Sequence, residues 1–462
     1  MNKSFLRGLL LGAGVSLFAI LAGAVIAGCA INAGGRHTIA IGTPTAGATR
    51  TADLDITITP EVKTPDVDPV STATPEAAVT QAVSGNTGAE IPGNTPTPTP
   101  TRNVSYNISK DLLKDDFEDK LLLLGQIIEA YYYQPVAVED LQEGLYKGIM
   151  SAVGDPYTCY YTPEEYDALN ESTSGTYCGI GAYVSQNVNT MIITIVKPFV
   201  DGPAYKAGMR AEDVIYKVDG IDVTSMDINN VVAMMKGPEG TQVVVTVYRD
   251  GEYIDLTITR AFITVPTVEH EMKEGNIGYI QVSSFDEVTG PQFISAVDDL
   301  TSKGMKGLII DLRDNTGGLL MTCIDMADYI LDQNKLIVYT KDRDGLGDNF
   351  YSDDGHSVNV PIVILINGYS ASASEVFTGA LKDHGVAYTI GTKSFGKGIV
   401  QSILPLTDGS AVKLTTSSYF CPSGVCVHGV GIEPDTEVIL DKEAEEDNQI
   451  KAAIEYLQKN IR

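Results

Sequence analysis

The chain is short of positive charge. Its 462 residues include 32 lysines and arginines against 60 aspartates and glutamates, which leaves a formal net charge of −28. A protein of this charge is repelled by a phosphate backbone, and no basic patch in the sequence reverses the balance. The composition therefore argues against any function that requires binding to nucleic acid.

Cysteine and histidine are also scarce. None of the six cysteines has the spacing of a metal-ligand set, so we expect no metal and no other cofactor. Cys421 and Cys426 flank a Pro-Ser-Gly turn, and their spacing leaves open whether they form a disulfide or remain free thiols. Of the five histidines, His384 directly follows an aspartate, Asp383. Sequence neighbours rarely relay a proton to each other, so a Ser-His-Asp site is not expected.

Residues 1–30 have the pattern of a targeting segment. Lys3 and Arg7 precede an uncharged apolar run, 8–28, which is long enough to span a bilayer. The end of this run resembles a bacterial lipobox, in which Cys29 would carry the lipid. A single-pass signal anchor and a lipoprotein signal remain alternatives. Both predict a protein at the cell membrane whose folded part is extracytoplasmic.

Composition divides the rest of the chain into four regions. Residues 31–104 are rich in Thr and Pro and predict a disordered stalk. Residues 105–174 show helical periodicity and predict a small helical module. Residues 175–262 contain short β-branched runs around one amphipathic helix at 227–236. In residues 263–462, apolar strands alternate with helices, which predicts a layered α/β domain. The strands are expected at 278–283, 307–312, 361–367 and 387–390, and the helices at 290–303, 319–331 and 374–384.

Two segments at strand ends of this last region carry candidate catalytic residues. Ser372 follows a buried strand and precedes a helix, where free backbone N–H groups and the positive helix end can stabilise an oxyanion. With Glu375 it also spells a capping box, which by itself indicates a helix cap more often than a nucleophile. Lys397 lies between two glycines and has apolar neighbours. Desolvation there would lower its pKa from about 10.4 towards that of a general base.

A third segment, 310–318, ends in Gly317-Gly318, where the backbone can approach a ligand closely. The three segments together contain D-L-R-x-N-x-G-G, S-A-S-A-S-E and F-G-K-G-x-V-Q, and P-S-G followed by G-I-x-P-D lies downstream. In order and spacing, residues 117–440 resemble peptidase family S41, the C-terminal processing (tail-specific) peptidases. The resemblance implies a serine endopeptidase with a ClpP/crotonase-like α/β core, an inserted PDZ domain and an N-terminal helical module.

The resemblance also implies roles for individual residues. Ser372 would be the nucleophile, Lys397 its base, and Gln401 the residue that orients the base. Asp383 stands where some family members have an aspartate of the catalytic relay. The oxyanion donors would be the backbone N–H groups of Gly318 and Ala373.

The geometry of a β-strand constrains this triad. On a regular strand, Lys397 and Gln401 would be about 13 Å apart, so their contact requires a turn or an irregular loop. The glycines on either side of Lys397 permit one.

The region 175–262 would be the PDZ domain of the family. Its carboxylate-binding loop would be Gly179-Ile180-Gly181-Ala182, whose N–H groups hold the C-terminus of a protein substrate. The last side chain of that substrate would enter an apolar pocket near Ile180, Val231 and Met235. We therefore expect protein substrates with apolar C-termini, and a homo-oligomer is compatible with this reading.

Two other functions compete with that of a serine endopeptidase. Ser394 and Lys397 spell the Ser-x-x-Lys pattern of acyltransferases, but the Ser-Asp-Asn and Lys-Thr-Gly motifs are absent. A catalytically silent PDZ scaffold tethered to the membrane is the non-enzymatic alternative, and the intact candidate triad argues against it.

Overall fold

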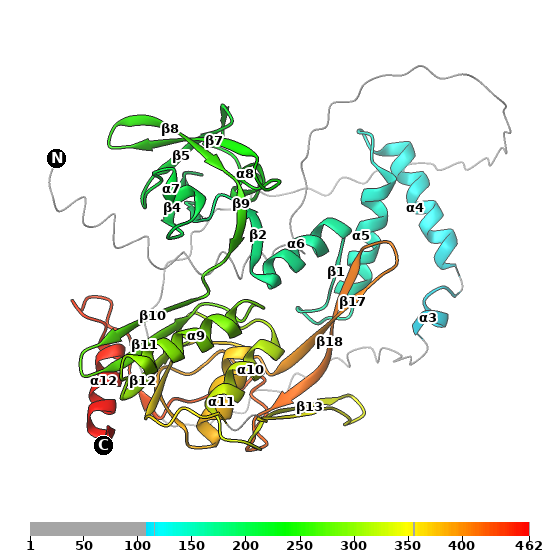
Figure 1. Ribbon diagram of the computed structural model, residues 1–462. Coiled ribbons are helices and arrows are strands. Elements are labelled where there is room, and N and C mark those ends of the chain that lie inside the picture. Colours follow the sequence, from blue (N-terminus) through cyan, green and yellow to red (C-terminus); the bar gives the residue numbers. More distant parts are fainter. Residues whose placement is uncertain (1–107, 115, 354–355, 462) are drawn as a thin grey trace, which may run out of the picture. The chain divides into compact units, whose positions relative to one another are not determined.

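The computed structural model describes residues 108–114, 116–353 and 356–461 (Figure 1). It divides the chain into two units, of which one comprises residues 33–135 and the other the remaining residues. In the first unit, the described elements are α3 (Ile108–Asp111) and α4 (Phe117–Tyr131). None of the described helices has the length and apolar character needed to cross a bilayer. The predicted anchor, Cys29 and the predicted stalk all lie outside the described residues.

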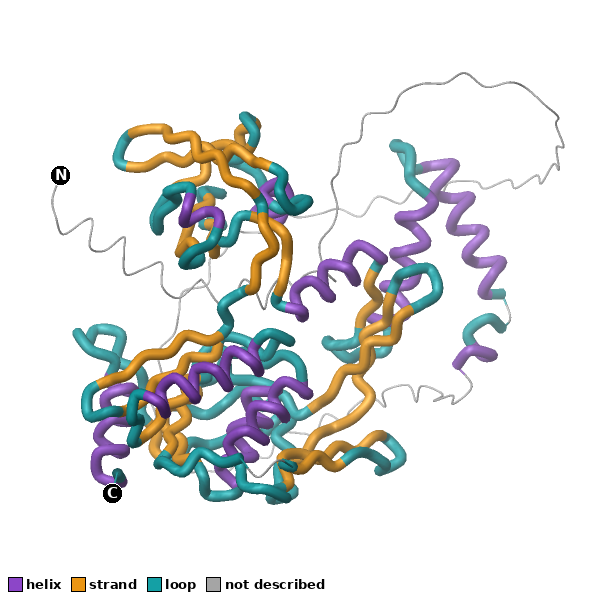
Figure 2. The backbone as a smooth tube through the Cα atoms, viewed as in Figure 1, coloured by secondary structure: helices purple, strands orange, loops and turns teal. Residues whose placement is uncertain are grey.

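The PDZ region forms a six-stranded antiparallel sheet with two short helices (Figure 2). Its strand order is β3-β4-β5-β7-β8, and β6 pairs with β5. The helix predicted at 227–236 is confirmed, and the Asp227 side chain caps it by accepting a hydrogen bond from the N–H of Asn229 at 2.9 Å. The elements are β3 (Ala182–Gln186), β4 (Ile193–Pro198), α7 (Pro203–Lys206), β5 (Val214–Val218), β6 (Ile221–Asp222), α8 (Ile228–Met235), β7 (Gln242–Arg249) and β8 (Glu252–Thr259).

A two-stranded neck flanks this sheet in the sequence. Strands β2 (Thr176–Gly179) and β9 (Ala261–Thr264) are antiparallel, and Gly179 is the register partner of Ala261. The chain therefore enters and leaves the PDZ domain at the same place.

The predicted layered domain is built on a second six-stranded sheet, in the order β10-β11-β12-β15-β16-β19. In this sheet the neighbouring strands from β11 through β12, β15 and β16 to β19 pair in parallel, and β10 is an antiparallel edge strand. The core segments of β12 and β15 are buried on both faces, which is why they read as continuous apolar runs. The strands are β10 (Val268–Lys273), β11 (Ile277–Val282), β12 (Gly307–Asp311), β15 (Ile362–Ile366), β16 (Ala387–Gly391) and β19 (Thr436–Glu437).

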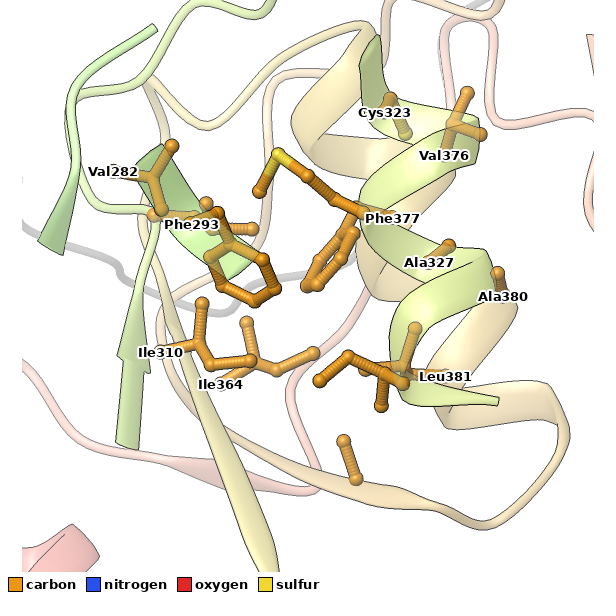
Figure 3. Close-up of a cluster of buried hydrophobic side chains, with 14 of the residues drawn as sticks. Val282, Phe293, Ile310, Cys323, Ala327, Ile364, Val376, Phe377, Ala380 and Leu381 are labelled. Carbon is orange, nitrogen blue, oxygen red and sulfur yellow. The ribbon is translucent and has the colours of Figure 1, made fainter. Parts of the chain in front are cut away.

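Helices cover both faces of this sheet (Figure 1). Alternate residues of one strand serve the two sides: Ile310 packs under α9, α10 and α11, whereas Ile309 packs under α12. Figure 3 shows the first side, where the rings of Phe293 and Phe377 meet edge to face with centroids 6.0 Å apart. The helices are α9 (Thr289–Ser302), α10 (Leu320–Ile330), α11 (Ala373–Asp383) and α12 (Asn448–Asn460), and the positions predicted for the first three are confirmed.

A five-stranded antiparallel sheet, which the sequence pattern did not predict, completes this unit. Its order is β1-β18-β13-β14, and β17 also pairs with β18. Strand β1 brings distant chain to the core, because Cys159 is the register partner of Lys413. The elements are α5 (Val138–Ser151), β1 (Cys159–Tyr161), α6 (Pro163–Ser174), β13 (Leu336–Asp342), β14 (Asn349–Tyr351), β17 (Ile399–Pro405) and β18 (Ala411–Phe420).

Candidate active site

Three alternate serines precede and open α11, and only the middle one is accessible. Ser370 is fully buried and its hydroxyl donates to the carbonyl of Leu312 at 2.8 Å. Ser374 is fully buried as well and donates to the carbonyl of Asn315 at 2.8 Å. Ser372 is partly exposed, so the structure leaves it as the one serine of the cluster that a substrate can reach.

The backbone at Ser372 is strained. Its φ of 55° and ψ of −115° are rare for a residue with a side chain, and such conformations concentrate at functional sites. The Glu375 half of the predicted capping box forms, because the carboxylate of Glu375 accepts the N–H of Ser372 at 2.9 Å. The cap and the nucleophile are therefore compatible roles for one serine.

The glycine pair lies beside this turn. A Cβ on Gly317 would stand 2.7 Å from the carbonyl oxygen of Ala371 and 3.0 Å from the backbone nitrogen of Ala373, so only glycine fits. Within the described part of the chain, the N–H groups of Gly318 and Ala373 have no hydrogen-bond partner. Both predicted oxyanion donors are thus free to bind a substrate oxygen.

Glu375 joins the nucleophile segment to the lysine segment, and sequence reasoning assigned it no more than a capping role. Its side chain is fully buried in the first turn of α11. One oxygen accepts the N–H groups of Ser372 at 2.9 Å and of Lys397 at 2.8 Å. The other accepts the hydroxyl of Ser394 at 2.6 Å and the N–H of Gly396 at 2.8 Å. Its capping-box position was the only signal of this role in the sequence.

Tyr419, on β18, makes a second connection that no sequence signal revealed. Its buried hydroxyl lies 2.5 Å from the carbonyl oxygen of Lys397 and 3.1 Å from that of Ser372. Burial raises the pKa of this hydroxyl well above its ordinary value, which keeps it a donor. The Ser372 and Lys397 segments are therefore held together at their backbone N–H groups by Glu375 and at their backbone carbonyls by Tyr419.

The Lys397 amine has the character that a general base requires. Burial lowers its pKa to about 8, and the like charge of Lys413 contributes, while Asp155 and Glu375 act in the opposite direction. The amine lies over the ring of Tyr157, 4.5 Å from its centroid. Among the described residues, no hydrogen bond joins the amine to Ser372 or to Gln401.

Gln401 and Asp383, the other two predicted site residues, bond to different parts of the chain. Strand β17 begins two residues after Lys397 and is irregular between Val400 and Gln401, so the chain from Lys397 to Gln401 is not a straight strand. The Gln401 amide donates to the hydroxyl of Thr415 at 3.3 Å. Asp383 ends α11, about 16 Å along the helix from Ser372. There it accepts the N–H of Ser423 at 2.9 Å.

The key residues of the two alternative serine enzymes, the Ser-x-x-Lys type and the Ser-His-Asp type, are bonded to other parts of the protein. Ser394 is buried, and it donates to Glu375 and accepts the N–H of Ile432 at 2.7 Å, so it is not available as a Ser-x-x-Lys nucleophile. His384 bonds the carbonyl of Leu336 at 2.7 Å. Cys421 and Cys426 are both free thiols, although the predicted turn between them forms.

The predicted carboxylate-binding loop joins β2 to β3. Gly181 has a φ of 75°, and Ile180 is buried in the PDZ core together with Val231 and Met235. Burial raises the pKa of the Tyr177 phenol to about 12, and the nearby backbone N–H groups of Ala182 and Gly181 act against that rise. The phenol of Tyr177 therefore lies at the N–H groups that the sequence assigned to a peptide carboxylate.

Comparisons with known proteins identify the family of the chain. The family model of peptidase family S41 matches residues 276–438, and that of the PDZ domain matches residues 196–249. The chain is 38% identical over 323 residues to the carboxy-terminal processing protease CtpA of Bacillus subtilis, which covers 70% of this chain and 69% of the relative. It is also 38% identical over 329 residues to the carboxy-terminal-processing protease of Bartonella bacilliformis, with coverages of 69% and 75%.

The solved structures that are similar to this chain include another C-terminal processing protease. The photosystem II D1 C-terminal processing protease is 28% identical, with a TM-score of 0.43, and the match covers 74% of this chain and 92% of that chain. The family matches and the extent of the Bacillus and Bartonella alignments decide the assignment. The chain belongs to peptidase family S41, and it is a C-terminal processing serine protease that carries a PDZ domain.

Proposed function

We propose that the chain captures apolar C-termini of proteins on its PDZ domain and cleaves the bound chain with Ser372 as nucleophile and Lys397 as base. The observation that carries this proposal is the shared carboxylate oxygen of Glu375. It binds the backbone N–H groups of both residues at 2.8–2.9 Å, and it thereby holds a strained serine and a half-buried lysine in one constellation.

The chemistry follows from the placement of these groups. The neutral amine of Lys397 takes the proton of Ser372 Oγ as that oxygen attacks the scissile carbonyl. The N–H groups of Gly318 and Ala373 receive the negative charge of the tetrahedral intermediate. The ammonium then returns the proton to the leaving amine, and a water molecule hydrolyses the acyl-serine by the same steps.

This sequence of events requires the lysine side chain to move. In the described structure the amine lies over Tyr157 and makes no hydrogen bond to Ser372. Catalytic hydrogen bonds are often long before substrate binds, and tighten in the complex. Gln401 would bond the amine in that second position, which remains a prediction, as does the relay role of Asp383.

The decisive experiment compares the parent enzyme with Ser372→Ala and Lys397→Ala on an unfolded protein that has an apolar C-terminus. Each substitution should reduce kcat by more than about 1,000-fold, because nucleophile and base act as one unit. Ser374→Ala is the matched control, since that hydroxyl is buried against Asn315. Equal cleavage by parent and Ser372→Ala would refute the assignment. Binding without cleavage by the parent would favour the silent PDZ scaffold.

We propose separately that the protein is anchored at the cell membrane with its folded part outside the cytoplasm. It depends on residues 1–30, with Lys3 and Arg7 before the apolar run. Mass spectrometry of the mature N-terminus distinguishes the two kinds of anchor. A lipid on Cys29 identifies a lipoprotein, and an intact residue 1–30 segment identifies a signal anchor. Release of the protein from membranes by salt alone would contradict both.

A further inference from the structure

The turn before β1 reaches the catalytic lysine although it is 240 residues away in the sequence. Tyr157 is the only described residue whose ring lies under the Lys397 amine, at 4.5 Å from the ring centroid. At this distance the negative face of an aromatic ring attracts an ammonium ion. The contact is therefore selective for the protonated form of the lysine.

This turn is anchored independently of the lysine. Asp155 accepts the N–H of Tyr157 at 3.1 Å and the hydroxyl of Thr158 at 2.6 Å. The hydroxyl of Thr158 in turn accepts the N–H of Thr415 on β18 at 3.2 Å. Because Thr415 is also the register partner of Gln401, the turn is fixed to the same strand pair that carries the site.

We propose that Tyr157 is a positioning residue of the proteolytic site, whose ring face holds the protonated amine of Lys397 in a resting position away from Ser372. The proposal rests on the assignment of Lys397 as the base. Release of the proton ends the attraction to the ring and frees the amine to approach the serine. The ring thus sets the pH range in which the base becomes available.

Other groups also act on the amine, and they remain in place when Tyr157 is replaced. The titratable groups around the lysine segment are Asp155 on the same turn, Glu375 on α11, Lys413 and Tyr419 on β18, and Cys426 and His428, which pack against Gly398. A substitution that keeps the site apolar but removes the ring therefore isolates the effect of the aromatic face.

The test compares Tyr157→Leu with Tyr157→Phe. Leucine keeps apolar bulk over the amine but offers no ring face, whereas phenylalanine keeps the face and loses only the hydroxyl. The amine of Lys397 is titrated by NMR in ¹³C-lysine-labelled protein carrying Ser372→Ala, with its signal assigned through Lys397→Met. In parallel, the acid limb of kcat/KM is measured with the nucleophile intact.

With Tyr157→Leu, the lysine titration and the acid limb should both move about 0.5 to 1.5 pH units towards lower pH. Tyr157→Phe should titrate like the parent. A purely structural role would lower the rate without moving either curve. Far-UV circular dichroism checks the fold, and Tyr157→Met replaces the leucine variant if that variant does not fold.

Two results would overturn the inference: an unmoved or upward titration in the folded leucine variant, or an equal displacement in Tyr157→Phe. Failure of the proposed function looks different. If Lys397→Ala remains active, the lysine is not the base, whatever the NMR titration shows. If activity depends on Lys397 but its acid limb is indifferent to Tyr157→Leu, only the role of Tyr157 is refuted.

Discussion

At the scale of single residues, the site shows how burial separates identical side chains. Three serines within five residues have the same chemistry, and the sequence motif alone does not separate a helix cap from a nucleophile. The hydroxyls of Ser370 and Ser374 donate hydrogen bonds to backbone carbonyls of the neighbouring loop. Ser372 alone combines access with a strained backbone, and this difference exists only in the folded chain.

Lys397 should cost the protein stability at neutral pH. Its pKa is lowered from 10.5 in the unfolded chain to about 8 in the fold, mainly by burial. The unfolded state therefore binds the proton more tightly, so the destabilisation is full below pH 8 and disappears as pH rises past 10.5.

Lys397→Met should accordingly raise the free energy of unfolding at pH 7 by about 1 to 3 kcal/mol. Urea denaturation at several pH values measures this, and the gain should shrink between pH 8 and pH 10.5. Lys393→Met, at an exposed lysine paired with Glu433, is the control and should change stability by less than about 1 kcal/mol at every pH. A gain that is equal at pH 7 and pH 11 would contradict a buried, depressed lysine.

At the scale of elements, the site depends on the close approach of the 310–318 loop to the start of α11. Gly317 has a φ of 103°, and its missing Cβ leaves room for the carbonyl of Ala371 and for Ser372. A side chain at this position would have to push the turn that carries Ser372 away from the loop that carries Gly318.

Gly317→Ala should therefore reduce kcat by about 100-fold or more, the scale of a lost oxyanion donor. Gly251 is the matched control, because it has a similar φ of 95° but open space around its Cβ position. Gly251→Ala should show a similar backbone strain without the loss of activity. Peptidase assays with thermal unfolding separate the two effects, and comparable loss of activity in both variants would refute the steric argument.

Local pattern predicted some elements far better than others. Strands β11, β12, β15 and β16 and helices α9 to α11 lie within one or two residues of their predicted positions, because parallel strands buried on both faces are continuous apolar runs. The sheet of β1, β17 and β18 had no such signal. Strands β17 and β18 are only partly buried, and β1 pairs with chain about 250 residues away, which no local pattern records.

At the scale of the whole molecule, the PDZ domain is an insertion whose two ends meet. Gly179 and Ala261 are register partners in the neck, so a two-residue Asn-Gly turn can join them in place of residues 180–260. The sheets of the protease core contain no strand from the deleted segment. The shortened protein should therefore fold.

We expect this deletion variant to lose its preference for substrates with a free C-terminal carboxylate. The assay compares two peptides that differ only in C-terminal amidation, at equal concentration. The parent should cleave the free-acid peptide with at least about tenfold higher kcat/KM, and the variant should cleave both alike. An unchanged preference in the variant would show that the PDZ domain does not select the substrate.

The sequence by itself determined the family and singled out the candidate catalytic residues, because spaced motifs and apolar periodicity are local properties of the chain. Only the tertiary structure decided which serine is accessible and how Glu375 and Tyr419 join the Ser372 segment to the Lys397 segment. The same holds for the resting place of Lys397 over Tyr157. Its altered pKa also arises from burial and from charges on distant segments, which come together only when the sheets pair.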